Sequence, residues 1–211
     1  MQLQSTLFDP KSENKLNPMT AIQRFNLVSV DDYLAGELNS PVKHEYLGGV
    51  VYAMAGAKNA HNRIATNIVG LLHAKLRKKS CQPFNSDTKI RIRLPTHVRF
   101  YYPDASVICH PNPPDDSFQD EPVVLFEVIS DATRRTDEGE KKDAYLTLQS
   151  LSLYAIVEQE TGLVIVHRRT NQGFHREVYS GLEQSIPLPE IEAELALAEI
   201  YEGVSISNSA E

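Results

Sequence analysis

The sequence predicts an α/β domain, with a mixed central sheet flanked by helices, from two features. First, residues 59–79 repeat apolar side chains at helical spacing, and several short runs of β-forming residues follow them. Second, another helical segment, residues 136–150, lies between the strand-like runs 123–129 and 154–158. A strand–helix–strand order joins two parallel strands through a right-handed crossover. The remaining runs then complete a mixed sheet with helices on its faces.

The first part of the chain predicts a short helix, a hairpin and the long helix. Residues 29–34 are typical of a helix that begins after the N-cap Ser29, because acidic residues occupy its first turn. Residues 42–54 hold two extended runs on either side of Gly48-Gly49, which indicates a hairpin. The apolar stripe of the long helix consists of Ile64, Ile68, Leu71, Leu72 and Leu76.

The rest of the chain predicts strands that alternate with two further helices. Strand-like runs occupy residues 88–94, 98–102, 105–109 and 123–129. Thr136 is the expected N-cap of the second helix. C-terminal strands are expected at 154–158, 163–168 and 174–179, with a turn at Thr161-Gly162 and a short helix near 195–201.

The chain length favours one domain. With 211 residues, 41% of them hydrophobic, we expect a domain at 28–203, a flexible arm at 1–27 and a disordered tail at 204–211. No run approaches the roughly 18 apolar residues of a membrane span. The N-terminus also lacks the apolar run of a signal peptide. We therefore expect a cytoplasmic protein with no membrane partner.

Cysteine and histidine usage gives no support for a zinc site. Cys81 and Cys109 are too few for a disulfide framework or a four-thiolate site, and we expect two buried, reduced thiols. The seven histidines are scattered and show no HExxH spacing.

The net charge of −7 does not exclude a nucleic-acid partner. Residues 181–211 hold seven carboxylates and no Lys or Arg, whereas residues 1–180 carry 21 acidic and 21 basic side chains. A neutral body with clustered bases can bind a phosphate backbone.

Glu127 is the most informative residue of the chain. It interrupts the run 123–129, whose other members are all apolar, as in a strand buried on both faces. Burying a carboxylate costs several kcal/mol unless a cation or hydrogen bonds compensate it. Glu127 therefore indicates a cation site or, alternatively, a contact with a backbone group or an arginine.

Asp104 supports the cation site. It follows Pro103 inside an otherwise strand-like segment, so that a bend is expected there. Two carboxylates at the ends or bends of neighbouring strands form an oxygen-rich pocket, which suits Mg²⁺. A Pro-Asp pair alone is also typical of an ordinary turn.

Lys141 adds a positive charge. It lies on the helical stripe that continues with Ala144, Tyr145 and Leu148, and Asp137 stands one turn before it. A lysine on an apolar stripe usually extends to solvent. This one follows a strand that carries a buried carboxylate, and it can neutralise charge there.

Several blocks of the sequence together resemble a known family. They are His44-Glu45-Tyr46-Leu47-Gly48-Gly49, Gly56-Ala57 with His61-Asn62-Arg63-Ile64-Ala65, Ser86-Asp87, Tyr102-Pro103-Asp104, Glu127-Val128-Ile129-Ser130, and Thr133-Arg134 with Asp137, Lys141 and Tyr145. Over residues 28–203 their order and spacing resemble the Uma-type family of restriction-endonuclease-like proteins, within the PD-(D/E)XK nuclease superfamily. The resemblance implies an αβββαβ restriction-endonuclease-like core, extended here by the N-terminal hairpin and the C-terminal strands.

One position departs from the superfamily pattern, which has a lysine two residues after the glutamate. Ile129 stands there in this chain. The resemblance makes Lys141, on the following helix, the replacement for that lysine.

The resemblance also implies roles for the site residues. Asp104 and Glu127, with the backbone carbonyl of Val128, would hold Mg²⁺, for which Mn²⁺ substitutes. Lys141 would orient the attacking water or stabilise the charge on the phosphate. Glu45 would bind the metal ion directly or contact the residues that bind it. His61 would bind DNA phosphate or transfer a proton, unless it is an ordinary residue at a helix start.

Basic residues that would hold DNA fall into two sets. Lys89, Arg91 and Arg93 alternate along one strand, so that they share a face. Arg134 and Arg135 precede the helix of Lys141. For both sets the alternative is an ordinary solvated surface.

The leading hypothesis is a magnesium-dependent endodeoxyribonuclease, an endonuclease that acts as a homodimer because two-fold symmetry suits cuts in both DNA strands. The alternative from another class is a catalytically silent nuclease fold that binds DNA or a protein partner. A small-molecule metal hydrolase is less favoured, because the chain has no histidine cluster and no nucleophile elbow.

Overall fold

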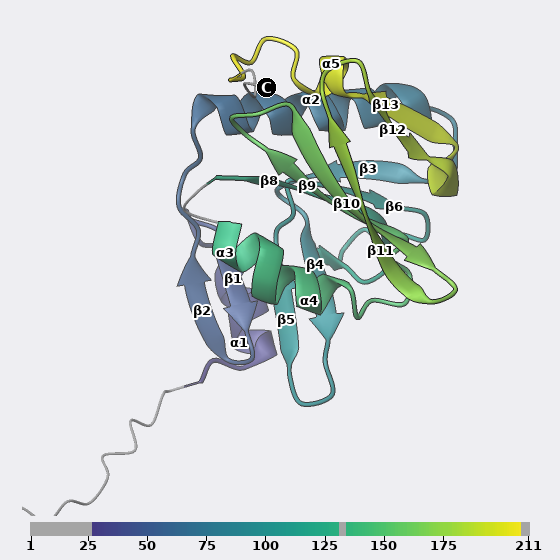
Figure 1. Ribbon diagram of the computed structural model, residues 1–211. Coiled ribbons are helices and arrows are strands. Elements are labelled where there is room, and N and C mark those ends of the chain that lie inside the picture. The colour runs from purple at the N-terminus through teal and green to yellow at the C-terminus, as the bar shows by residue number, and fades with distance from the viewer. Residues whose placement is uncertain (1–26, 131–133, 208–211) are drawn as a thin grey trace, which may run out of the picture.

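The structure, a computed structural model, describes residues 27–130 and 134–207 and confirms the mixed α/β class (Figure 1). The helices are α1 (Val30–Glu37), α2 (Asn59–Leu76), α3 (Arg134–Thr136), α4 (Lys142–Tyr145) and α5 (Leu197–Ile200), with a π-helical turn η1 (Asp137–Lys141) and a 3-10 turn η2 (Pro189–Ile191). The strands are β1 (His44–Leu47), β2 (Val50–Ala53), β3 (Gln82–Asn85), β4 (Lys89–Arg93), β5 (Val98–Tyr101), β6 (Ala105–Ile108), β7 (Phe118–Gln119), β8 (Pro122–Ile129), β9 (Leu153–Glu158), β10 (Leu163–Thr170), β11 (Gly173–Ser180), β12 (Ser185–Leu188) and β13 (Ala193–Ala196).

A six-stranded sheet forms the centre of the domain, in the order β11-β10-β9-β8-β6-β3. Strands β8 and β9 are parallel, as the strand–helix–strand order predicts. The other neighbouring pairs of this sheet are antiparallel, so that the sheet is mixed. A second sheet has the order β2-β1-β5-β4-β7 and contains the predicted hairpin β1–β2, while β12 and β13 form a separate pair.

The central sheet is covered on both faces. Helix α2 lies across one face together with β12, β13 and α5, whereas η1 and α4 lie on the other (Figure 1). The apolar stripe of α2 buries Ile64, Ile68 and Leu72 in one core cluster with Phe126 of β8. Tyr145 of α4 belongs to the cluster on the opposite face. The predicted stripe of the long helix is thus its core face.

The chain crosses from the second sheet to the central sheet at Pro103. Tyr101 is the last residue of β5 in the second sheet, and Ala105 is the first residue of β6 in the central sheet. Proline has no N–H to donate to a strand ladder, so that a continuous strand is interrupted there. Asp104 therefore lies at the junction between the two sheets.

The second predicted helix is shorter and less regular than expected. It begins at Arg134, passes through η1 and ends at Tyr145 rather than near residue 150. Thr136 is not its N-cap, because the backbone of Thr136 is already helical and its side chain makes no capping hydrogen bond. Helical geometry is broken at Gly139, with φ −108° and ψ −108°.

Short strands account for most other differences from the prediction. The patterns gave no sign of β3, β7, β12 or β13, and residues 193–196 are a strand rather than the start of the predicted helix at 195–201. The long helix ends at Leu76 instead of residue 79. Strands of two to four residues offer too few positions for alternation to stand out.

Cys81 and Cys109 form a disulfide, so that the expectation of two reduced thiols is wrong. They are the neighbours of Gln82 and Ile108, which pair across β3 and β6. Because β3 was not predicted, nothing in the sequence put Cys81 opposite Cys109.

Part of the predicted tail is in contact with the domain. Val204 and Ile206 pack against the core, and the backbone N–H of Ser207 donates to the carbonyl of Glu160 at 2.8 Å. The predicted arm, apart from Leu27, and residues 208–211 lie outside the described residues. None of the described helices is long and apolar enough to cross a membrane.

The packing of α2 gives a first prediction. Ile68→Ala should lower the free energy of unfolding by about 2–5 kcal/mol, because Ile68 is fully buried and the truncation leaves a cavity. Urea denaturation measures the change. The matched control is Arg63→Ala on the exposed side of the same helix, with an expected effect within about 0.5 kcal/mol. Equal effects of the two substitutions would contradict the assignment of the core face.

Candidate active site

Glu127 lies on the face of β8 that is turned away from α2. Its neighbours Phe126 and Val128 belong to the core under α2, and side chains alternate along a strand. Glu127 therefore points toward η1 and α4. The residue is 4% exposed, so that the carboxylate is buried as expected.

Lys141 brings an ammonium to this carboxylate. Its Nζ lies 2.9 Å from Glu127 Oε1, 3.0 Å from Glu45 Oε1 and 3.7 Å from Asp137 Oδ1. The side chain is 6% exposed, and the ammonium lies over the ring of Tyr101, 5.4 Å from its centroid. The structure thus brings together Glu127 of β8, Glu45 of β1 and Lys141 of η1.

Negative charge exceeds positive charge in this cluster, because Glu45, Glu127 and Asp137 share one ammonium. Burial raises the pKa of Glu127 well above its usual range, while the charge of Lys141 opposes that shift and the charge of Asp137 adds to it. Burial lowers the pKa of Lys141, but the three carboxylates outweigh burial and raise it well above its usual range. Lys141 therefore stays protonated, and Glu127 takes up a proton more readily than an ordinary glutamate.

Two buried tyrosines hold the acids in place. The hydroxyl of Tyr145 donates to Glu127 Oε1 at 3.2 Å, and that of Tyr154 donates to the backbone carbonyl of Asp137 at 3.0 Å. Burial raises the pKa of both tyrosines well above the usual range, so that they remain neutral donors. Sequence reasoning used Tyr145 and Asp137 only as neighbours of Lys141. Each of them lies four positions from Lys141, one helical turn before or after it. This spacing was the signal in the sequence that could have identified them.

Asp104 lies next to Glu127 through the backbone of β8. Its Oδ2 accepts a hydrogen bond from the backbone N–H of Val128 at 2.7 Å. The same oxygen lies 3.2 Å from Nε2 of His61, in the first turn of α2. Burial lowers the pKa of His61, but the hydrogen bond to Asp104 and the charge of that carboxylate outweigh it, so that the pKa is raised overall. His61 is thus a partner of Asp104.

The donors of the site fit a divalent cation that keeps part of its water shell. In the part of the chain that the structure describes, no three His, Cys, Asp or Glu side chains are arranged to hold an ion by themselves. Mg²⁺ does not need such a cage, because it is usually bound through one or two carboxylates and retains several waters. Asp104 and Glu127 provide that number, and their mutual repulsion also raises the pKa of Glu127. The excess of negative charge favours a cation.

The strand of Lys89, Arg91 and Arg93 is not an open basic face. Lys89 is 5% exposed and lies over the ring of Tyr102, 5.3 Å from its centroid. Arg91 donates two hydrogen bonds to Asp120, both at 2.7 Å. Arg93 has a side chain that is 60% exposed and pairs with Asp120 at 3.3 Å. DNA contact by this strand stays a prediction, and Arg93 is its most accessible member.

Arg134 and Arg135 also differ in how accessible their side chains are. Arg134 donates to both carboxylate oxygens of Glu158, at 2.6 and 2.7 Å, and to Glu138 at 3.0 Å. These contacts tie the start of α3 to the end of β9. Arg135 is exposed.

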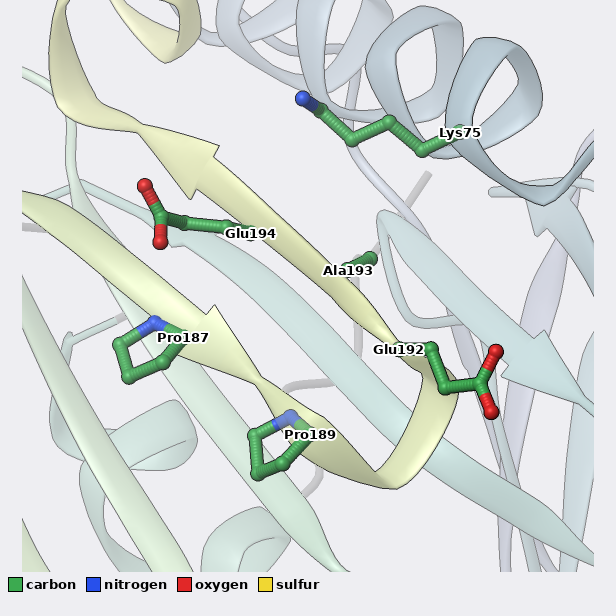
Figure 2. Close-up of a pocket in the computed structure, with 6 residues that line it drawn as sticks. All are labelled: Lys75, Pro187, Pro189, Glu192, Ala193 and Glu194. Carbon is green, nitrogen blue, oxygen red and sulfur yellow. The ribbon is translucent and has the colours of Figure 1, made fainter.

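A hollow elsewhere on the surface contains none of the predicted residues. Figure 2 shows it between α2 and the β12–β13 pair, lined by Lys75, Pro187, Pro189, Glu192, Ala193 and Glu194. Glu192 pairs with Lys79 at 3.5 Å and is largely exposed, so that its charge is solvated. The buried acids around Lys141 therefore remain the candidate site.

Comparisons with known proteins identify a family and two similar proteins. The sequence model of the Uma2 family, described as "Putative restriction endonuclease", matches residues 30–199. An uncharacterized protein of Synechocystis sp., slr1290, is 28% identical over 182 residues, which cover 86% of this chain and 95% of the relative. Another from the same organism, sll1609, is 26% identical over 144 residues, or 67% of this chain and 80% of the relative.

A solved structure shares the fold. It is the crystal structure of a "putative nuclease belonging to DUF820" from Anabaena variabilis, with a TM-score of 0.63 and 16% sequence identity. The alignment covers 80% of this chain and 97% of the other.

The buried ion pair gives a second prediction. Lys141→Met should lower the free energy of unfolding by about 3–5 kcal/mol near pH 8, because it leaves Glu127 without its ammonium. A carboxyl with a raised folded pKa contributes stability that is present below its unfolded pKa and lost as the pH rises through the folded pKa. Lys141→Met raises that folded pKa further. The loss should therefore be smaller near pH 5 in urea denaturation.

Two further variants control this experiment. Lys142→Met removes the adjacent, more exposed lysine, which pairs with Asp143 at 3.5 Å, and should cost at most about 1 kcal/mol. Adding Glu127→Gln to Lys141→Met should recover part of the stability at the higher pH. A loss that does not depend on pH would mean that Lys141 does not balance the charge of Glu127.

Proposed function

Since the chain belongs to the Uma2 family of restriction-endonuclease-like proteins, we propose that it is a metal-dependent endodeoxyribonuclease that hydrolyses DNA phosphodiester bonds. The observation that carries the proposal is the ammonium of Lys141, buried 2.9 Å from the carboxylate of Glu127. The superfamily lysine is missing at Ile129, and a lysine that reached the same carboxylate from another element would replace it. Lys141 meets that condition.

The acids supply the metal part of the proposal. Asp104 and Glu127, with the carbonyl of Val128, would hold Mg²⁺ or Mn²⁺. Such an ion lowers the pKa of a bound water and offsets the charge that develops on a scissile phosphate. The carboxylates of Glu45, Glu127 and Asp137 share the charge of one lysine, and Asp104 adds a further negative charge that acts on Glu127, so that another cation relieves the repulsion.

Lys141 supplies a fixed positive charge in this proposal. Its three carboxylate neighbours keep it protonated, and an ammonium is a compact charge suited to a phosphate oxygen. In a site with little water such a charge stabilises a developing anion more strongly than in solvent. Glu45 and Asp137 also contact the ammonium, at 3.0 and 3.7 Å. Tyr145 keeps the Glu127 carboxylate oriented through its hydrogen bond.

DNA would be held by the exposed basic residues Arg93 and Arg135. Arg135 precedes η1, and Arg93 ends β4, so that both are available for phosphate contacts. A two-fold homodimer would present two such sites to the two strands of a duplex. A DNA substrate also agrees with the cytoplasmic location expected from the sequence.

Cleavage of DNA tests the proposal directly. The purified protein should nick supercoiled plasmid with Mg²⁺ or Mn²⁺, whereas Asp104→Asn and Lys141→Ala should each reduce the rate by at least about 100-fold. Gel electrophoresis measures the rate, and circular dichroism checks that each variant is folded. The matched controls are Asp143→Asn and Lys142→Ala, which remove a more exposed carboxylate and a more exposed lysine at the start of α4.

Two outcomes would contradict the assignment in different ways. Full activity in both Asp104→Asn and Lys141→Ala would remove these residues from the mechanism. A wild-type protein that binds DNA but cleaves none with either metal would be the catalytically silent binding module instead.

The salt dependence of DNA binding gives a further prediction. If Arg93 and Arg135 each neutralise one phosphate, Arg93→Ala and Arg135→Ala should each lower the slope of log affinity against log salt by about 1. Fluorescence anisotropy with a labelled duplex measures the slope. Arg176→Ala, on the exposed edge strand β11, is the control and should leave it unchanged. Unchanged slopes for Arg93→Ala and Arg135→Ala would place the DNA elsewhere.

A further inference from the structure

We propose that His61 supplies a nitrogen ligand to the metal ion of the site, so that the site favours Mn²⁺ and similar transition ions over Mg²⁺. The inference rests on the proposed metal-dependent function and deepens it. It assigns to a helix residue a part in a metal site otherwise built from the carboxylates of Asp104 and Glu127.

The geometry of the pair carries the inference. His61 Nε2 and Asp104 Oδ2 are 3.2 Å apart. Two adjacent ligands, each about 2.1 Å from an octahedral ion, lie about 3 Å from one another. The two atoms are therefore spaced as neighbouring ligands of a single ion.

The backbone of β8 adds a third element at the same place. Val128 donates its N–H to Oδ2 of Asp104 at 2.7 Å, on the same oxygen that faces the ring of His61. Carboxylate, imidazole and backbone of β8 thus converge from three separate elements. His61 faces this point from the first turn of α2.

Charge favours a cation at this point rather than elsewhere in the cluster. Lys141 is already committed to Glu45, Glu127 and Asp137. Asp104 is largely buried, and its nearest cationic partner is a histidine, which is charged only when protonated. A divalent ion beside Asp104 would add a second positive charge that acts on Glu127, whose pKa the charge of Asp104 raises.

The type of ligand atom determines which metal ion the site prefers. Mg²⁺ takes oxygen ligands almost exclusively, whereas an imidazole nitrogen suits first-row transition ions. For Nε2 to act as a ligand its hydrogen must leave, and the neutral ring then carries its hydrogen on Nδ1. Nδ1 is buried and has no hydrogen-bond partner among the described residues, so that this exchange consumes part of the binding free energy of the metal.

Pulsed EPR on Mn²⁺ bound to the full-length protein tests the inference without measuring activity. The wild type should show magnetic coupling between Mn²⁺ and a directly bound nitrogen, and labelling the histidines with ¹⁵N should change that coupling. In His61→Gln the nitrogen signal should disappear, because glutamine keeps a polar contact with Asp104 but has no imidazole. Mn²⁺ affinity, from titration calorimetry, should fall by at least about 10-fold while Mg²⁺ affinity changes little.

The control is His73→Ala, which removes an exposed histidine of the same helix and should leave both readouts unchanged. Bound Mn²⁺ with no nitrogen coupling in the wild type would overturn the assignment of His61 but leave a carboxylate metal site intact. No bound Mn²⁺ at millimolar concentration would overturn both this inference and the metal dependence of the proposed function.

Discussion

The interaction on which the site depends is the burial of one carboxylate, Glu127, on a strand that is covered on both faces. Removing a carboxylate from water costs several kcal/mol, and the cost is recovered only if positive charge and hydrogen-bond donors are brought to it. Lys141 and Tyr145 do so from the segment that follows β8 in the chain. The position of η1 and α4 against the central sheet is therefore tied to the charge of a single side chain.

Two interruptions of regular backbone bring the remaining groups to that carboxylate. Pro103 ends the ladder of β5, so that Asp104 falls between the two sheets instead of inside a strand. The helix is kinked at Gly139, inside the segment η1 that carries the buried residues Asp137 and Lys141. Regular strands hold Glu127 and Glu45, whereas the interrupted segments carry Asp104, Asp137 and Lys141.

Local sequence patterns predicted part of the site, whereas the rest depends on contacts between distant parts of the chain. An acid inside an apolar run predicted the buried Glu127, and helical spacing placed Lys141 on the face toward the sheet. The contact of Glu45 with Lys141 requires the second sheet to pack against η1, for which no local signal exists. The disulfide could not be predicted, because it depends on the register of the unpredicted strand β3. Likewise, Lys89 and Arg91 are not free for DNA because Lys89 packs on Tyr102 and Arg91 binds Asp120.

The two partners of the buried ion pair are held in different ways. Glu127 is fixed by strand pairing on both sides of β8, whereas η1 is held to the rest of the domain by a few side chains. Arg99 of β5 pairs with Glu140 at 2.9 Å, and Arg134 joins the helix start to Glu158. Glu127 is therefore positioned by backbone pairing, whereas Lys141 is positioned by the side-chain contacts that join η1 to the rest of the domain.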